Sequence, residues 1–315
     1  MAETVRLGIV GAGLAAQLHA RNLAGFPDVT IAAVCDPDRE RARALAERCG
    51  AAVHESAEAM LEAEALDAAY VCVPPFAHGP PEEAALARGL PLYIEKPLAA
   101  DRETARAIAA RVAAAGVPTQ VGHQWRYRAF VPEARALLAE RPARLVLARW
   151  LADLPAAAWW ADERRSGGQV VEQTVHLLDL ARWLAGEVIE VQAVAVRRGD
   201  LAVASAALLR FASGGVGSVS STCLLDRASA SDVRVVADGL SIDLGARAMA
   251  VERDGEAFTR EERGSAMERA DRAFVDAVRG LAADLRSPYA DALRSHELAQ
   301  AIAESARTGQ AVRLD

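Results

Sequence analysis

Three ionisable side chains lie at helical spacing in the second half of the chain. Glu172 precedes His176 by four positions, and Asp179 follows it by three. Residues three and four positions apart share one face of an α-helix, so this spacing predicts that the side chains point the same way. An imidazole titrates near neutral pH and can move a proton in catalysis. A lone helical histidine more often has a structural partner, and Asp179 could pair with Arg182 or support another residue of a site.

A second chemical motif, Glu95-Lys96-Pro97, directly follows the strand-like run 92–94. Taken alone, Glu95 and Lys96 would be an ordinary surface pair. At the carboxyl end of a parallel strand, however, an ammonium group can point into the cleft where such sheets bind ligands. A cation in that place can stabilise negative charge that develops during a reaction.

The pattern Gly11-x-Gly13-x-x-Ala16 lies between the strand-like run 7–10 and a helical pattern over 14–24. The first glycine permits a tight turn, the second lets the backbone approach a pyrophosphate, and the alanine lets the helix pack on the strand. The N–H groups and the dipole at the start of the helix then favour the phosphates. We therefore predict a dinucleotide site. The alternative is a strand-to-helix turn that binds nothing.

Asp36 ends the second strand-like run, 23 positions after Gly13. A carboxylate there would accept hydrogen bonds from the adenosine ribose hydroxyls and would repel a 2′-phosphate. The predicted cofactor is therefore NAD. Arg39 leaves NADP open, because an arginine near this position could hold the additional phosphate.

A third motif, Val73-Pro74-Pro75-Phe76-Ala77-His78, follows the strand-like run 68–73. It would lie at the carboxyl edge of the sheet, where doubly wound sheets bind their ligands. His78 is therefore a candidate cofactor contact. Stabilisation of its own loop is the alternative role for this side chain.

The elements that would position these motifs alternate along the first part of the chain. Strand-like runs and helical patterns follow one another up to residue 121, as is typical of βαβ units in a doubly wound parallel sheet. Beyond it, strand-like runs separated by turn signals indicate an α+β domain with a largely antiparallel sheet. We predict a Rossmann domain over 1–121 and an α+β domain over 122–315, whose last helix could pack back on the first. Strands of the second domain are expected at 144–151, 188–197, 202–211, 215–224, 232–236, 240–244 and 248–253, and its strongest helix at 170–184.

Composition limits the classes of function. The 315 residues carry a formal net charge of −7. Acidic residues interleaved with the arginines argue against a nucleic-acid binder, and the acidic total argues against binding to an anionic membrane surface. No apolar run reaches the length of a membrane span and no leader peptide is evident, so a cytoplasmic enzyme is expected. The four cysteines form no CxxC pair and no cluster with histidine, so no metal site is expected.

Together these motifs resemble the glucose-fructose oxidoreductase, inositol dehydrogenase and MocA family, abbreviated Gfo/Idh/MocA. The resemblance spans nearly the whole chain. It implies an N-terminal Rossmann domain, a C-terminal open-faced sheet domain, and hydride transfer at a carbinol of a sugar, cyclitol or related polyol. It also implies a homo-oligomer, dimer or tetramer, built through the sheet. The resemblance rests on Gly11-Ala12-Gly13-Leu14-Ala15-Ala16, Pro74 with His78, Glu95-Lys96-Pro97, Gly167-Gly168, His176-Leu177-Leu178-Asp179 and the ending from Ser305 to Val312.

The resemblance also implies roles for single residues. Oxidising an alcohol needs a hydride acceptor, a base for the hydroxyl proton and stabilisation of the developing alkoxide. The family gives the base role to His176 and the stabilising role to Lys96. Glu172 stands where many relatives have aspartate, and it could orient His176 or hydrogen-bond a substrate hydroxyl. The implied cofactor contacts are Gly11, Gly13, Leu14, Ala15, Asp36, Arg39, Val73, Pro74, His78, Glu95 and Lys96.

Substrate contacts are expected in two segments and on the catalytic helix. One segment follows the last strand-like run of the Rossmann domain, and the other precedes Gly167-Gly168. Aromatic faces suit the C–H surfaces of sugars, although paired tryptophans could instead close a core or an interface. The candidate substrate contacts are Gln124, Arg126, Trp159, Trp160, Arg164 and Asp179.

Two other functions remain open. A family member could use NAD in an internal redox cycle for glycoside cleavage or epimerisation, and NADH would then not accumulate. The chain could instead be a non-catalytic sensor that binds the dinucleotide and regulates a partner protein. The presence of both Lys96 and His176 argues against the sensor.

Overall fold

The computed structural model describes residues 4–314, which divide into two compact units. The first unit runs through Ala99, continues over Glu103–Tyr127 and takes up Ser265–Leu293. The second unit contains Ala100–Arg102, Arg128–Gly264 and the chain from Arg294 onward. The first unit thus extends past residue 121 and regains a segment from near the C-terminus.

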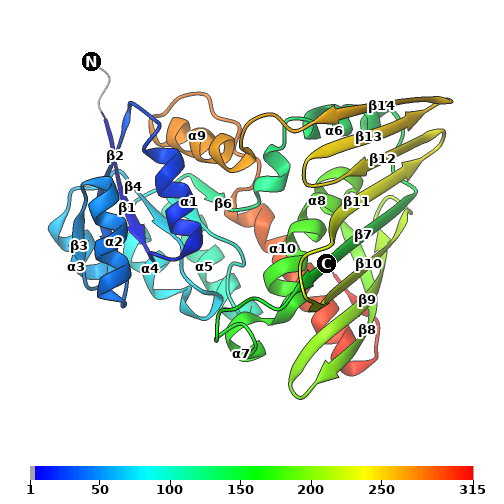
Figure 1. Cartoon of the computed structure of the whole chain (residues 1–315), viewed down its shortest axis with the longest axis horizontal. Coiled ribbons are helices and arrows are strands. Elements are labelled where there is room, and N and C mark those ends of the chain that lie inside the picture. Colours follow the sequence, from blue (N-terminus) through cyan, green and yellow to red (C-terminus); the bar gives the residue numbers. More distant parts are fainter. Residues whose placement is uncertain (1–3, 315) are drawn as a thin grey trace. The chain divides into compact units, whose positions relative to one another are not determined.

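The first unit is built on a six-stranded parallel sheet in the order β3-β2-β1-β4-β5-β6 (Figure 1). The strand order reverses between β1 and β4, which is the switch point where doubly wound sheets bind ligands. This architecture confirms the predicted Rossmann fold. The strands are β1 Val5–Val10, β2 Val29–Cys35, β3 Ala52–His54, β4 Ala68–Val71, β5 Leu92–Ile94 and β6 Thr119–Val121.

Both faces of this sheet are covered by helices, which explains why its central strands are apolar on both sides. One core packs β1 and β4 against α1 and α9, through residues such as Leu7, Tyr70 and Phe274. The other packs β4 and β5 against α4 and α5, through residues such as Val71 and Ile108. The helices of this unit are α1 Leu14–Leu23, α2 Arg39–Cys49, α3 Ala57–Ala63, α4 Pro80–Leu86, α5 Arg102–Ala115 and α9 Ala266–Val278, with 3-10 turns at Pro75–Ala77 and Gln124–Tyr127.

The second unit contains a nine-stranded sheet in the order β14-β13-β12-β11-β7-β10-β9-β8-β15 (Figure 1). Every neighbouring pair is antiparallel except β7 with β10, so the predicted mostly antiparallel sheet is confirmed. Its strands are β7 Leu145–Asp153, β8 Val188–Arg198, β9 Leu201–Phe211, β10 Val216–Leu225, β11 Ala230–Ala237, β12 Leu240–Leu244, β13 Ala248–Arg253, β14 Glu256–Glu261 and β15 Val312–Arg313.

Helix α8, Val175–Ala185, packs against β7 and β11 of this sheet and is buried along nearly its whole length. The predicted continuous α-helix over 170–184 is wrong in its first part, because Val170–Thr174 forms a π-helical turn. Such widened turns interrupt the regular α-helical hydrogen bonding and are frequent at functional sites. The remaining helices are α6 Val131–Glu140, α7 Glu163–Ser166 and α10 Tyr289–Thr308, whose first residues belong to the first unit.

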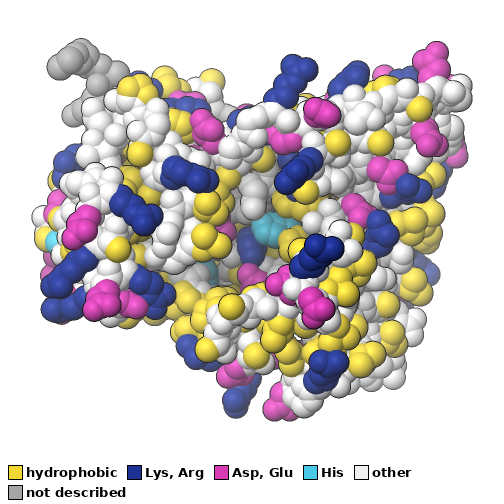
Figure 2. Space-filling view, viewed as in Figure 1, with side chains coloured by type: hydrophobic (Ala, Val, Ile, Leu, Met, Phe, Trp, Pro, Cys, Tyr) yellow, Lys and Arg dark blue, Asp and Glu magenta, His cyan; other side chains and the backbone are white. Residues whose placement is uncertain are grey.

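Charged side chains of both signs are interspersed over the face of the molecule shown in Figure 2. Within the described range, no helix combines the length and apolar character that crossing a membrane requires. Over the same residues, His, Cys, Asp and Glu side chains form no group of three that could hold a metal ion.

Candidate active site

The two glycines of the loop after β1 have different reasons to be glycine. Gly11 has a φ of 92°, and a Cβ there would stand 2.3 Å from the carbonyl oxygen of Cys72. Its N–H donates a hydrogen bond to the carbonyl of Cys35, 2.8 Å away. Any larger residue at position 11 would therefore strain the backbone and collide with Cys72, the residue after β4. The fold itself requires this glycine.

At Gly13, neither the backbone conformation nor a neighbouring atom of the protein requires glycine. Its φ of −71° suits any residue, and an added Cβ would meet no atom within 4 Å. It precedes α1, whose first turn has neither a side-chain cap nor an acidic residue. Leu14, the first helical residue, is 74% exposed, whereas Ala16 is fully buried against the core. A glycine followed by an open helix N-terminus fits close approach by an anionic ligand.

Asp36 is fixed across the end of this loop. One carboxylate oxygen accepts the N–H of Ala12 and the other accepts the N–H of Asp38, each at 2.8 Å. Arg39, the candidate for binding a 2′-phosphate, is ion-paired with Glu55. The structure therefore fixes a carboxylate beside the glycine loop and engages the nearest arginine with an acid.

His78 lies in a buried hydrogen-bond arrangement after β4. Its Nδ1 is 2.5 Å from one oxygen of Glu82, and the other oxygen accepts the N–H of Gly79 at 2.7 Å. The side chain is completely buried, and no described residue bonds to Nε2. Glu82 therefore fixes the ring, and Nε2 remains for a ligand. Val73 and Pro74, in the same segment, are partly exposed.

Lys96 follows β5 at the carboxyl edge of the same sheet and is partly exposed. The preceding residue, Glu95, is 7% exposed, and its carboxylate contacts the buried imidazole of His19 at 3.0 Å. No local sequence pattern marks His19 as a partner of Glu95. The composition does mark Lys96: of the 36 lysines and arginines in the chain, it is the one lysine. A cation that only served solubility or a surface ion pair could be arginine, as all the others of these 36 are.

Gln124 and Arg126 lie together in the 3-10 turn after β6 but differ in their environments. Arg126 is fully buried, ion-paired with Asp291 at 2.5 Å and bonded to the carbonyl of Arg286 at 2.5 Å. Gln124 is partly exposed, yet its Oε1 is buried and no described residue donates to it. Gln124 therefore has an acceptor to offer a ligand, whereas the Arg126 guanidinium is committed to holding its own segment.

In the second unit, Glu172 and Trp160 contact each other directly. The indole N–H of Trp160 donates to Oε2 of Glu172 at 2.7 Å. Trp160 is 1% exposed and packs with Val203 and Cys223, while its neighbour Trp159 is only partly buried. The indole N–H of Trp160, a predicted substrate contact, is thus engaged by Glu172 within the unit. Arg164 is almost entirely exposed, with its guanidinium 3.3 Å from Asp162.

His176 is 6% exposed and stacks on Trp150 of β7. The ring centroids are 6.0 Å apart and the planes are inclined by 20°. Trp150 was another residue that the sequence analysis did not identify, because its pairing with His176 exists only once β7 and α8 pack together. The indole face therefore packs against the imidazole of His176.

Asp179 lies completely inside the second unit, one turn after His176. Its Oδ1 accepts the hydroxyl proton of Ser295 at 2.7 Å, and that hydroxyl accepts a hydrogen bond from Arg182 at 2.7 Å. Arg182 also donates twice to Glu187. These contacts place Asp179 in a structural cluster and support the alternative in which it is linked to Arg182.

Two family models match the chain. One, described as an oxidoreductase family with an NAD-binding Rossmann fold, matches residues 5–123. The other, the GFO/IDH/MocA C-terminal domain, matches residues 143–242.

Curated proteins and solved structures point the same way. Inositol 2-dehydrogenase 4 of Saccharopolyspora erythraea is 35% identical over 203 residues, which are 61% of this chain and 57% of that protein. The rhizopine catabolism protein MocA of Rhizobium meliloti is 34% identical over 189 residues, 58% of this chain and 57% of that protein. The match thus spans little more than half the length of these relatives. A structure of levoglucosan dehydrogenase with NADH and levoglucosan superimposes with a TM-score of 0.90 at 19% identity, covering 99% of this chain and 100% of that chain, which shows a common fold.

The glycine loop, the Glu-Lys-Pro motif and the His-x-x-Asp helix therefore stand in the two domains to which the family models assign them. The chain belongs to the Gfo/Idh/MocA family of oxidoreductases.

Proposed function

We propose that this protein is an NAD-dependent dehydrogenase that transfers a hydride between the nicotinamide and a carbinol of a sugar, cyclitol or related polyol. The observation that carries the proposal is the placement of Lys96. The one lysine among 36 basic residues follows β5, at the sheet edge that also holds the glycine loop after β1. Inositol dehydrogenases among the relatives support the substrate class.

The first unit offers the features that NAD binding requires. The Gly11–Gly13 loop and the start of α1 would hold the pyrophosphate, and Asp36 would accept hydrogen bonds from the ribose hydroxyls. NAD is favoured over NADP because Asp36 would repel a 2′-phosphate and Arg39 is already paired with Glu55. The orphaned Nε2 of His78 adds a donor or acceptor at the same edge. When bound, the cofactor supplies the hydride acceptor.

The protein's own side chains would handle the proton and the charge. We assign His176 as the base that accepts the hydroxyl proton, because its ring is nearly buried and oriented by Trp150. Lys96 would stabilise the negative charge that develops on the substrate oxygen. Glu172, held by Trp160, would accept a hydrogen bond from a substrate hydroxyl or orient His176. Gln124 would offer its buried Oε1 to the substrate.

Absorbance at 340 nm tests this proposal, with NAD and NADP offered separately against a panel of inositols, sugars and other polyols. We expect NADH to form with one substrate class and NAD to be preferred. Lys96→Ala and His176→Ala should each remove most turnover, while NAD binding measured by calorimetry stays largely intact. Full turnover in both variants would contradict the mechanism. Conversion of a sugar without NADH accumulation would indicate an internal redox cycle instead.

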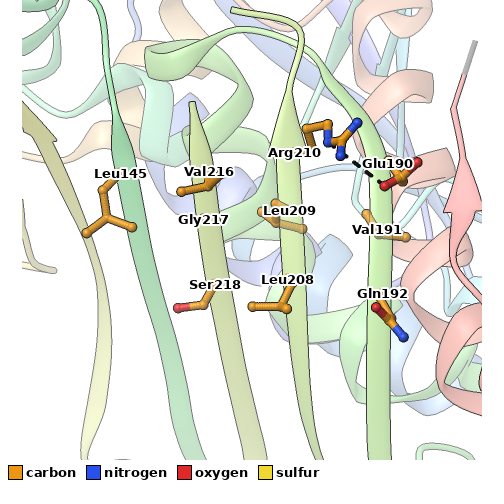
Figure 3. Close-up of a pocket in the computed structure, with 10 residues that line it drawn as sticks. All are labelled: Leu145, Glu190, Val191, Gln192, Leu208, Leu209, Arg210, Val216, Gly217 and Ser218. Carbon is orange, nitrogen blue, oxygen red and sulfur yellow. Dashed lines mark ion pairs between the residues drawn. The ribbon is translucent and has the colours of Figure 1, made fainter. Parts of the chain in front are cut away.

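We further propose that the protein forms a homo-oligomer through the outer face of the second sheet. Aliphatic side chains stand exposed there on β8, β9 and β10: Val194 is 67% exposed, Leu208 64% and Val216 54%. Leu208 and Val216 line a hollow that also includes Glu190 and Arg210, which form an ion pair (Figure 3). Exposed apolar patches of this kind mark interaction sites. Light scattering should give a dimer or tetramer, and Leu208→Lys should dissociate it; a monomeric wild type would contradict the proposal.

A cytoplasmic location remains part of the proposal. It is supported by the cysteines, Cys35, Cys49, Cys72 and Cys223, which are all free thiols. Thiols persist in reducing compartments. Cell fractionation with an antibody to the protein would test the location, and recovery outside the cytoplasm would contradict it.

A further inference from the structure

A cluster of buried ionisable side chains lies inside the first unit. His19, on α1, is fully buried between two carboxylates. Its Nδ1 is 2.6 Å from Asp271 on α9, and its Nε2 is 3.0 Å from Glu95. The second oxygen of Asp271 accepts a hydrogen bond from Asn22 at 2.8 Å. The cluster therefore joins the helix of the glycine loop, the C-terminal helix α9 and the residue before Lys96.

The two carboxylates of this cluster favour the protonated form of His19. Burial alone would lower the pKa of His19, but the charges and hydrogen bonds of Asp271 and Glu95 outweigh it and raise this pKa to about 10. Burial also raises the pKa of the Asp271 carboxyl, although His19 and Asn22 oppose that shift. The other titratable groups nearby are Tyr70, Tyr93 and Cys72, and burial raises the pKa of each. They therefore stay neutral at physiological pH.

The same cluster leaves Glu95 almost no freedom. Its N–H donates to the carbonyl of Val71 at 2.8 Å, which ties the end of β5 to β4. The Glu95 side chain also lies against Gly122, where an added Cβ would stand 2.2 Å from Glu95 Oε1. The glycine therefore makes room for this carboxylate in one position. With His19 bound to the same oxygen, the backbone and the side chain of Glu95 are both fixed, and Lys96 is the next residue.

Packing alone does not explain three ionisable groups in this place. Replacing buried ion pairs by apolar side chains of similar size is often neutral or stabilising, so a charged cluster is a weak way to hold α9. Charged clusters do impose a particular geometry, because each partner must be satisfied. Here the cluster fixes the position of Glu95, the residue before Lys96.

We propose that His19, backed by Asp271, is a positioning residue for Lys96 and acts through the carboxylate of Glu95. This inference rests on the function proposed above, in which Lys96 contacts the reacting oxygen. His19 touches neither substrate nor reacting atoms. It fixes the strand end from which Lys96 extends, and it does so from the helix that begins at the glycine loop. Placement of the cofactor helix and of the catalytic cation is thereby linked.

Turnover tests the proposal with His19→Ala, His19→Gln and the control Arg272→Met. Arg272 is the residue after Asp271, but its guanidinium pairs with Asp28 at 2.8 Å and with Asp276 at 2.7 Å, so its loss weakens α9 while the His19–Asp271 and His19–Glu95 contacts remain. With the polyol that forms NADH in the panel, we expect kcat of His19→Ala to fall by up to about 100-fold, as for a misplaced catalytic group. His19→Gln can still donate to Glu95 and should recover part of kcat. The Kd for NAD should change little in both His19 variants. Arg272→Met should have a lower melting temperature than wild type but the same kcat.

A second measurement needs no substrate. Reductive methylation with ¹³C-formaldehyde labels Lys96 and the α-amino group alone, because the chain has one lysine. The Lys96 methyl resonance should move or split in His19→Ala, move less in His19→Gln, and stay in place in Arg272→Met. An unmoved resonance in His19→Ala, or equal kcat in His19→Ala and Arg272→Met, would overturn the positioning role. Undiminished turnover of Lys96→Ala would instead overturn the proposed function, so the two failures are distinguishable.

Discussion

In each unit of this protein, a buried basic side chain binds a helix from the C-terminal part of the chain, but the two side chains differ in kind. In the first unit, His19 binds Asp271 of α9. In the second, Arg182 binds the hydroxyl of Ser295 on α10. A histidine can lose its charge within the pH range of experiments, whereas an arginine cannot. The first unit is therefore held by a cation that titrates, and the second by one that is permanent.

The two clusters also end beside different proposed catalytic groups. The cluster of the first unit reaches Glu95, the residue before Lys96. The cluster of the second unit includes Asp179, one turn after His176 on α8. Among the 36 lysines and arginines of this protein, Lys96 is the one lysine, and His19 is one of six histidines. We expect the kind of cation to matter at both positions.

The largest effect is expected from Lys96→Arg. The variant keeps the positive charge, but a planar guanidinium cannot reproduce a compact ammonium at one oxygen atom. We expect kcat to fall by about 100- to 1000-fold, the range seen when one stabilising donor is lost. Steady-state kinetics with NAD and the selected polyol measure it. A variant with near wild-type kcat would show that any cation suffices at this position.

The two glycines of the loop allow folding and binding to be separated. Gly11→Ala should lower the free energy of unfolding by about 1–3 kcal/mol, because of its φ of 92° and the collision with Cys72. Gly13→Ala meets no atom of the protein, so its stability should change by less than about 1 kcal/mol. Its Kd for NAD should rise by about tenfold or more, which corresponds to about 1.4 kcal/mol. Urea unfolding and calorimetry measure both quantities; unchanged NAD binding in Gly13→Ala would remove the ligand explanation for this glycine.

These examples also show what could be predicted from the sequence. Gly11, Gly13 and Asp36 were found because strand, turn and helix are neighbours along the chain, so a local pattern carries the geometry. The Asp271 partner of His19 is 252 positions away, and no local pattern connects them. The return of Ser265–Leu293 to the first unit was unpredicted for the same reason.

In the second unit, the residues were found but their contacts were not. Glu172 and His176 were identified from helical spacing and the family resemblance. The π-helical turn at Val170–Thr174, the Trp160 hydrogen bond and the Trp150 stacking depend on packing between elements. The lone lysine was visible in the sequence, but counting lysine together with arginine concealed it.

The titrating cation of the first unit predicts sensitivity to alkali. The pKa of His19 is raised from 6.5 to about 10, so its charge stabilises the fold fully below pH 6.5 and this contribution is lost as pH rises through 10. The melting temperature of wild type should therefore exceed that of His19→Gln most at pH 6, and the difference should shrink by pH 10. Calorimetric scans across this range measure it. A difference that is constant with pH would mean that His19 is neutral in the folded protein.

Arg182, the permanent cation of the second unit, predicts that stability depends on pH in acid instead of in alkali, and that the effect is smaller. Burial alone would raise the pKa of Glu187, but Arg182 and Arg294 outweigh it and lower this pKa below its ordinary 4.5. Its ionised form therefore stabilises the fold above pH 4.5, and this contribution is lost as pH falls through the lowered value. The melting temperature of wild type should exceed that of Glu187→Gln at pH 7 and approach it in acid. The effect should be small because the Glu187 side chain is 43% exposed and its pairs are screened by solvent. If Glu187→Gln instead lost its difference in alkali, the cation of this cluster would be titrating, and the contrast between the two units would fail.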